Sequence, residues 1–176
     1  MMLTFKNPQI SIAAAADVTA VKDLLNAAYR GESSKQGWTT EAGLIAGETR
    51  TNNEMVLVAI EQAGSVILIY KEDNKIVGCV NLQQHDNRLY LGMFGVSPQL
   101  QGAGIGKKLL EASEEYALQV NCRAIYMSVI SVRTELIEWY RRHGYADTGE
   151  RKPFIEDEIA GKHLQPLEFM ILEKSL

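Results

Sequence analysis

Apolar positions in the first third of the chain recur mainly at helical spacing. A short apolar stretch predicts a strand at 9–13, and Asp17 stands where the N-cap of a helix belongs. Apolar residues three and four positions apart then predict one amphipathic helix over 18–29. Two short helices are expected at 41–46 and 53–63, although the second stretch also fits the alternation of a strand.

Strand-like alternation in the middle of the chain predicts a three-stranded antiparallel meander. Its turns contain Asp and Asn, which tolerate left-handed backbone angles. The third strand holds Gly92 and Gly95, and glycine in a strand often marks a bulge or the close approach of another group. We expect a bound group to lie against this strand, and room for a neighbouring helix is the alternative. The strands are expected at 66–70, 76–82 and 88–96, with turns at 73–74 and 85–87.

The last third of the chain returns to helical periodicity and ends in strands. An apolar stripe predicts a helix from Ile105 to Tyr116. A buried strand follows, and then a second helix that Ser131 caps and Gly144 closes. These later elements are expected at 124–130, 133–143, 145–150 and 167–172, with an i, i+4 pair between Glu138 and Arg142 and an irregular segment at 151–165.

The loop before the first of these helices has almost no side chains. Gly102, Gly104 and Gly106 leave successive backbone N–H groups uncovered, and the helix adds its own unpaired N–H groups and positive dipole end. This arrangement is typical of a pyrophosphate site, and a plain chain reversal is the alternative. A P-loop does not fit, because Gln101 replaces its first glycine and Lys108 its hydroxyl residue. The spacing of a dinucleotide-binding loop fits poorly as well.

The loop sequence Val-x-Pro-x-x-Gln-Gly-x-Gly-Ile-Gly-Lys at 96–107 resembles motif A of the GNAT superfamily of N-acetyltransferases. Residues 136–145, with an aromatic pair followed by Gly-Tyr, are similar to motif B of the same superfamily. The resemblance covers most of the chain. It implies a single domain over 1–176 of α/β class, with the GNAT acyl-CoA N-acyltransferase fold: a mixed, mostly antiparallel, splayed sheet flanked by helices.

The resemblance implies transfer of acetyl from acetyl-CoA to a primary amine of a small molecule or peptide by direct attack. Tyr140 matches the family tyrosine that protonates the departing thiolate, although core packing is the alternative for a helical tyrosine one turn after Leu136. In the family, backbone N–H groups, here around Phe94 and Val96, stabilise the oxyanion. With this resemblance, the group that we expect against Gly92 and Gly95 is an acyl chain. The implied cofactor contacts are Phe94, Gly95, Val96, Gln101, Gly102, Ala103, Gly104, Ile105, Gly106, Lys107 and Arg133.

Two departures from the family pattern concern the groups around the reaction. Arg133 stands where the family often has an Asn near pantetheine, and it could reach a phosphate instead. Tyr90 stands where several relatives carry a Glu base, so the sequence assigns no base. The expected acceptor residues are Trp38, Glu41, Tyr90 and Glu150, with packing as an equal alternative for Trp38 and a solvated turn for Glu150.

Charge and composition narrow the classes of partner. The chain of 176 residues has a formal net charge of −4, which gives no basic field for nucleic acid. No apolar run approaches a membrane span and no signal-peptide layout is seen, so we expect a cytoplasmic protein without membrane contact. Cys79 and Cys122 are expected as reduced core residues, and the scattered histidines suggest no metal site.

Several alternatives stay open at this stage. A non-catalytic CoA-binding sensor or scaffold would keep the loop without the chemistry, and an enzyme for longer acyl chains would use the space at the glycines of the third strand. A homodimer is compatible with the sequence. The acceptor cannot be inferred from the fold, because function has to be argued from the site.

Overall fold

The computed structural model describes residues 2–47, 49–154 and 161–176. Its strands are β1 (Ile10–Ile12), β2 (Ile45–Ala46), β3 (Ser65–Glu72), β4 (Lys75–His85), β5 (Arg88–Val96), β6 (Ala124–Ile130), β7 (Ala146–Pro153), β8 (Lys162–His163) and β9 (Glu168–Ser175). Its α-helices are α1 (Val18–Tyr29), α2 (Gly31–Ser34), α3 (Asn53–Glu61), α4 (Ile105–Gln119) and α5 (Thr134–Arg142).

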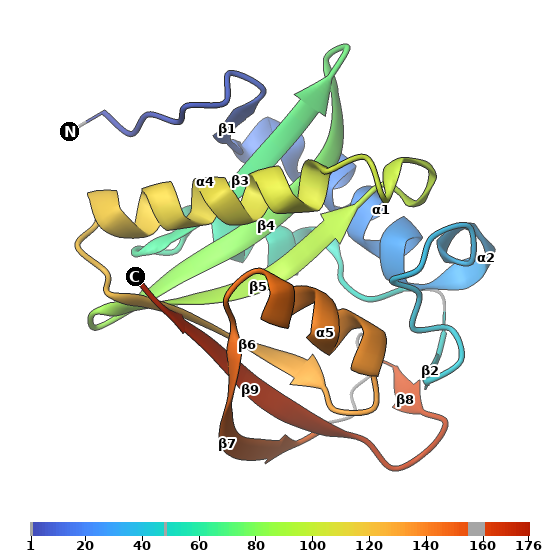
Figure 1. Ribbon diagram of the computed structural model, residues 1–176. Coiled ribbons are helices and arrows are strands. Elements are labelled where there is room, and N and C mark those ends of the chain that lie inside the picture. The colour runs from blue at the N-terminus through green and yellow to red at the C-terminus, as the bar shows by residue number, and fades with distance from the viewer. Residues whose placement is uncertain (1, 48, 155–160) are drawn as a thin grey trace.

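Seven strands form one sheet in the order β1-β3-β4-β5-β6-β9-β7, and β2 pairs separately with β8. All neighbours in the large sheet are antiparallel except β5 and β6, which are parallel. The expected α/β class and the mixed, mostly antiparallel sheet flanked by helices are therefore confirmed (Figure 1).

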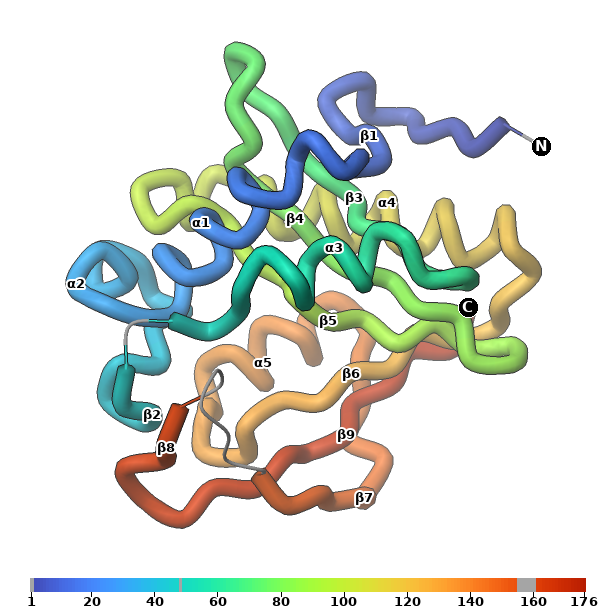
Figure 2. Tube along the Cα trace, turned by 180° about the vertical axis from the view of Figure 1, so that it is seen from behind, coloured from blue at the N-terminus to red at the C-terminus, as the bar shows by residue number. Residues whose placement is uncertain are grey.

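Helices cover both faces of the sheet because its strands alternate in burial. On β3, Ile67 and Ile69 pack with α1 and α3 in one apolar cluster, whereas Leu68 and Tyr70 belong to the cluster under α4 and α5. Figure 2 shows α1 and α3 together on the face opposite to α4. None of the helices within the described residues is both long and apolar enough to cross a membrane.

The sheet opens between β5 and β6. These strands pair only over 88–90 and 124–126, while β6 stays paired with β9 up to Ile130. A register shift between Cys79 and Asn81 in β4 and a positive φ of 44° at Met93 place a bulge on β5 just beyond the paired part. The two halves of the sheet thus diverge, as Figure 1 shows, and the splayed sheet is confirmed.

Most expected elements form, including the meander with left-handed residues at both turns and the helix at 53–61. The Asn52 side chain caps that helix by accepting from Met55 N at 2.9 Å. The expected helix at 41–46 was wrong. Its backbone makes one turn and then a strand, because Ile45 pairs with His163 in β8. The segment before it contains the short helix α2 over its first four residues.

Three local details also differ from the expectations. Asp17 accepts from Ala14 N instead of capping α1. Arg133, not Ser131, occupies the N-cap position of α5, and Glu138 pairs with Arg141 at 2.6 Å rather than with Arg142. Strand β7 continues to Pro153, so the irregular segment is shorter than expected, and its part at 155–160 lies outside the described residues.

Candidate active site

The glycine loop presents uncovered backbone donors at the start of α4. Gly102 and Gly104 have φ of +91° and +85°, which side-chain-bearing residues rarely adopt. Gly104 is the N-cap residue, so the first turn of the helix opens directly from the loop. No acceptor exists among the described residues for the N–H groups of Gly102, Gly104, Ile105, Gly106 and Lys107. Such groups together with the helix dipole favour an anion.

A cavity of about 530 Å³ lies against this loop. Its other walls come from β5 and from α5, where Trp139 and Tyr140 face it. A Cβ at Gly106 would lie 3.3 Å from the Trp139 ring, so the glycine lets the two helices approach. Of the expected cofactor contacts, the lining contains Phe94, Gly95, Val96, Gln101, Gly102, Gly104, Ile105, Gly106 and Lys107, while Ala103 lies in the same loop and Arg133 does not line this cavity.

Gln101 has a structural task in addition to its place in the loop. Its Oε1 accepts from Trp38 N at 2.8 Å, and its Nε2 donates to Thr39 Oγ1 at 2.8 Å and to Val96 O at 3.0 Å. The side chain therefore fastens the segment before β2 to the glycine loop. Trp38 lines the larger cavity and packs against Trp139 with ring centroids 6.1 Å apart, so both of its expected roles, binding and packing, are compatible with its position.

A second cavity of about 70 Å³ adjoins the first where the sheet opens. Both cavities are lined by Tyr29, Phe94, Leu136 and Tyr140. The smaller cavity extends from these residues toward β6 and a group of charged side chains. A ligand in one cavity would therefore meet a ligand in the other at this shared wall.

Tyr140 stands at that wall and is only 4% exposed. Its ring contacts Phe94, Trp139 and Tyr145 with centroid distances of 6.2, 5.2 and 5.8 Å. Its hydroxyl has no hydrogen-bond partner among the described residues. Burial raises the pKa of Tyr140 well above its usual range, with smaller raising effects from Tyr29 and Tyr145. The residue thus packs in the core and also lines both cavities.

Tyr29 is a site residue that the sequence patterns did not single out. It is the last residue of α1, where its spacing is that of an ordinary core position. The hydroxyl donates to the Phe94 carbonyl next to the β5 bulge, and burial raises the pKa of this phenol. Tyr29 therefore fixes the position of the bulged strand between the two cavities.

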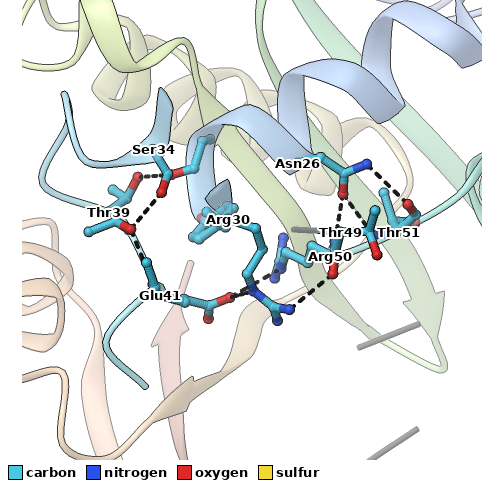
Figure 3. A network of polar contacts seen from close by, with 12 residues as sticks. Asn26, Arg30, Ser34, Thr39, Glu41, Thr49, Arg50 and Thr51 are labelled. Carbon is cyan, nitrogen blue, oxygen red and sulfur yellow. Dashed lines mark hydrogen bonds and ion pairs between the residues drawn. The ribbon is translucent and has the colours of Figure 1, made fainter. Parts of the chain in front are cut away.

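Glu41 lies in a buried cluster of charges beside the smaller cavity. Arg30 Nε donates to its Oε1 at 3.2 Å, Arg50 Nε lies 3.9 Å from the same oxygen, and Arg133 Nη1 lies 3.6 Å from Oε2. Figure 3 shows Arg30 and Glu41 pointing toward each other with Arg50 alongside. The side chains of Arg30, Glu41 and Arg133 are exposed by 2, 7 and 8%.

The structure changes the positions expected for several site residues. Arg133 donates to Thr39 O at 2.7 Å and lines the smaller cavity, so it is turned away from the expected phosphate site. Tyr90 lines neither cavity, because it packs against Tyr126 at 5.2 Å where β5 and β6 are still paired. Glu150 is exposed on β7, 3.9 Å from Lys152, and also lines neither cavity. Glu41 alone of the four expected acceptor residues lines the smaller one.

The glycines of β5 have different neighbours. A Cβ at Gly95 would lie 3.1 Å from Leu25 on α1, so this residue makes room for a helix, as the alternative held. Gly92 lines the smaller cavity, and a Cβ there would lie 3.3 Å from the ring of Tyr90. An acyl chain is therefore not needed to explain Gly95.

Both cysteines are buried free thiols, as expected. Burial raises the pKa of Cys79 to about 12, and its Sγ donates to Met93 O at 3.4 Å. Neither thiol lines a cavity. A protonated, buried thiol is a poor nucleophile.

Comparisons with known proteins agree with this geometry. Residues 19–145 match the description "Acetyltransferase (GNAT) family". A stretch of 82 residues is 32% identical to the spermine/spermidine N(1)-acetyltransferase of Bacillus subtilis strain 168, covering 46% of this chain and 47% of that protein. The chain thus aligns with about half the length of the curated relatives it matches.

Two solved structures show the same fold at low identity. The ribosomal-protein-S18-alanine N-acetyltransferase from Escherichia coli superposes with a TM-score of 0.70 at 13% identity, over 94% of this chain and 92% of that one. The protein yncA from Salmonella typhimurium, solved with its cofactor acetyl-CoA, gives 0.69 at 18% identity, over 97% and 95%. With the family match spanning most of the sequence, the chain belongs to the GNAT acetyltransferase family.

Proposed function

We propose that the protein is an acetyl-CoA-dependent N-acetyltransferase that modifies a primary amine, with Tyr140 as the general acid. The observation that supports this most directly is the shared wall of the two cavities. A donor bound along the glycine loop and an acceptor in the smaller cavity would meet at Phe94 and Tyr140. A binding protein without chemistry would have no need for the second cavity at this point.

The larger cavity fits acetyl-CoA. The unpaired N–H groups at the start of α4 suit a pyrophosphate, and any Cβ at Gly102 or Gly104 would demand a strained backbone. Lys107 and Arg142 add positive charge to the same lining. Acetyl-CoA would supply the activated acetyl group as a thioester.

The chain's own part in the reaction is to position the ligands and to hold a proton. Because its pKa is raised, the Tyr140 hydroxyl stays protonated, and we assign that proton to the sulfur that leaves. A free phenol and a free thiol differ by about 1.5 pKa units, or roughly 2 kcal/mol. Burial at this wall disfavours the thiolate as well and so raises the pKa of the thiol too. The pKa difference between phenol and thiol therefore widens by less than the rise in the pKa of the phenol.

The groups that act on the acceptor are assigned in less detail. Backbone N–H groups of β5 around Phe94 are proposed to stabilise charge on the acyl oxygen. The oxygens of Glu41 already face guanidinium groups, so we assign it a charge-balancing role and let water remove the amine proton. The name of the Bacillus relative makes a polyamine one candidate acceptor.

Ligand binding and CoA release test the proposal separately. Millimolar acetyl-CoA should raise the Tm of the wild type, because a ligand that binds only the folded state stabilises it. Gly104→Val should abolish the shift, because it adds a side chain to the glycine loop where the pyrophosphate would lie. Gly149→Val is the matched control, since Gly149 has a φ of +86° on exposed β7 and nothing within 4 Å, as at Gly104.

Free thiol is then measured with a panel of primary amines. Acetyl-CoA should release CoA only when an acceptor amine is present. Absence of a thermal shift in the wild type would refute the donor site. A shift without CoA release from any amine would instead favour the CoA-binding sensor.

A further inference from the structure

The charge balance beside the smaller cavity is unusual for a site that receives an amine. Among the described residues, the charged side chains that line this cavity are the two guanidinium groups of Arg50 and Arg133 and the one carboxylate of Glu41. Arginine keeps its charge in proteins, so this excess of one positive charge cannot be removed by titration. Buried charge is unfavourable unless it is balanced, and an anionic ligand would restore the balance.

Arg50 has the guanidinium most available to such a ligand. Its side chain is 30% exposed, and its 3.9 Å approach to Glu41 is longer than a hydrogen bond. The guanidinium carbon lies 4.2 Å from the centre of the Tyr29 ring, which holds it in place through a cation–π contact. No hydrogen bond joins its side chain to another described residue, so its donors remain available at the cavity wall.

Arg133 completes the pair, with its guanidinium carbon 5.9 Å from the centre of the same Tyr29 ring. It lines the same cavity, and its hydrogen bond to Thr39 O fixes one arm of the guanidinium. Two immobilised guanidinium groups bind a carboxylate with several charge-assisted hydrogen bonds. A polycation would meet like charges at the same place, and an ammonium group would be disfavoured relative to the neutral amine that reacts.

Resting on the proposed function, we propose that the acceptor is a small amino acid whose carboxylate is bound by Arg50 and Arg133. The cavity of about 70 Å³ has the volume of roughly two water molecules. It therefore suits a carboxylate and its neighbouring carbon, with the amine directed to the wall at Tyr140. The positively charged polyamines in the name of the Bacillus relative lack this group.

Pairs of acceptors that differ only in the carboxylate test whether the site binds this group. Steady-state CoA release is measured with L-alanine, L-serine and L-methionine, with the amide of each, and with spermidine. We expect kcat/KM to be at least tenfold higher for at least one acid than for its amide or for spermidine. In Arg50→Gln, KM for that acid should rise at least tenfold while KM for the amide stays within twofold.

Arg141→Gln is the control variant, because Arg141 is exposed on α5 and lines neither cavity. It should leave both values of KM unchanged. Arg50→Lys keeps the charge but not the planar fork, so it should recover only part of the preference. Thermal melts of all variants exclude loss of folding as the cause.

The results of these experiments distinguish failure of the carboxylate site from failure of the proposed acetyltransferase function. Acetylation of amides or spermidine in preference to the acids would overturn the carboxylate site and leave the acetyltransferase standing. If no amine releases CoA, binding still decides: the N-acetyl form of each acid, added with CoA, should raise the Tm of the wild type but not of Arg50→Gln. Equal shifts in both proteins, or none in either, would overturn the inference.

Discussion

The two cavities are built in opposite ways. In the larger cavity, the anion site that we propose is formed by backbone N–H groups of one contiguous loop and the first turn of α4. The charged cluster beside the smaller cavity consists instead of side chains from four separate places in the chain, Arg30, Glu41, Arg50 and Arg133. A backbone site depends on glycines and helix geometry, whereas a side-chain site can change its preference through single substitutions.

The largest effect is expected at the wall that the two cavities share. Tyr140→Phe removes the proposed acid and should lower kcat by about 10²- to 10⁴-fold while sparing CoA affinity. Tyr145→Phe is the control, because this neighbouring phenol is buried, has no hydrogen-bond partner among the described residues and lines neither cavity. Its kcat should equal that of the wild type. Unchanged turnover in Tyr140→Phe would reduce Tyr140 to a core residue.

A substitution in the charged cluster beside the smaller cavity should lower the free energy of unfolding strongly. Glu41→Gln removes the only carboxylate that faces the three guanidinium groups among the described residues, and losing one partner of a buried ion cluster costs about 3 to 5 kcal/mol. Denaturant unfolding measures the loss. The exposed pair of Glu138 and Arg141 supplies the comparison, since Glu138→Gln should cost about 0.5 kcal/mol or less. Similar losses in both variants would show that the cluster is not held as described.

The smallest expected effect concerns the pH profile, in which kcat/KM should show no decline at alkaline pH. Because the pKa of Tyr140 is raised, the phenol remains protonated as the pH rises. The neutral fraction of an alkyl amine grows about tenfold per pH unit below its pKa near 10.4. With such an acceptor, kcat/KM measured from pH 6 to 9 should therefore rise without a maximum. A decline between pH 7 and 9 would contradict a protonated Tyr140 as the acid.

The same contrast explains what could be predicted from the sequence. The Gly102 to Gly106 loop has its determinants next to one another, so spacing alone predicts a strand, a loop and a helix around an anion. Tyr140 could be proposed as the general acid from the sequence because it stands in a second contiguous motif. Alternation and turn residues predicted the sheet, since each strand carries its own pattern of burial.

The charged cluster beside the smaller cavity could not be predicted in this way. Arg50 lies in a segment without periodicity, and its contact with Tyr29 depends on how that segment packs after folding. Arg133 precedes α5, and its ion pair with Glu41 and its hydrogen bond to Thr39 O join it to a segment about ninety residues earlier in the chain. The helix expected at 41–46 failed for the same reason, because the partner strand β8 comes from more than a hundred residues away.

The side chain of Gln101 connects the walls of the two cavities through a series of hydrogen bonds. It donates to Val96 O in the wall of the larger cavity and to Thr39 Oγ1, and the carbonyl of Thr39 in turn accepts from Arg133, which lines the smaller cavity. We expect these bonds to couple the two cavities. Thermodynamic linkage makes any such coupling reciprocal: whatever factor a ligand in the larger cavity adds to the affinity for a ligand in the smaller one, the second ligand adds to the affinity for the first.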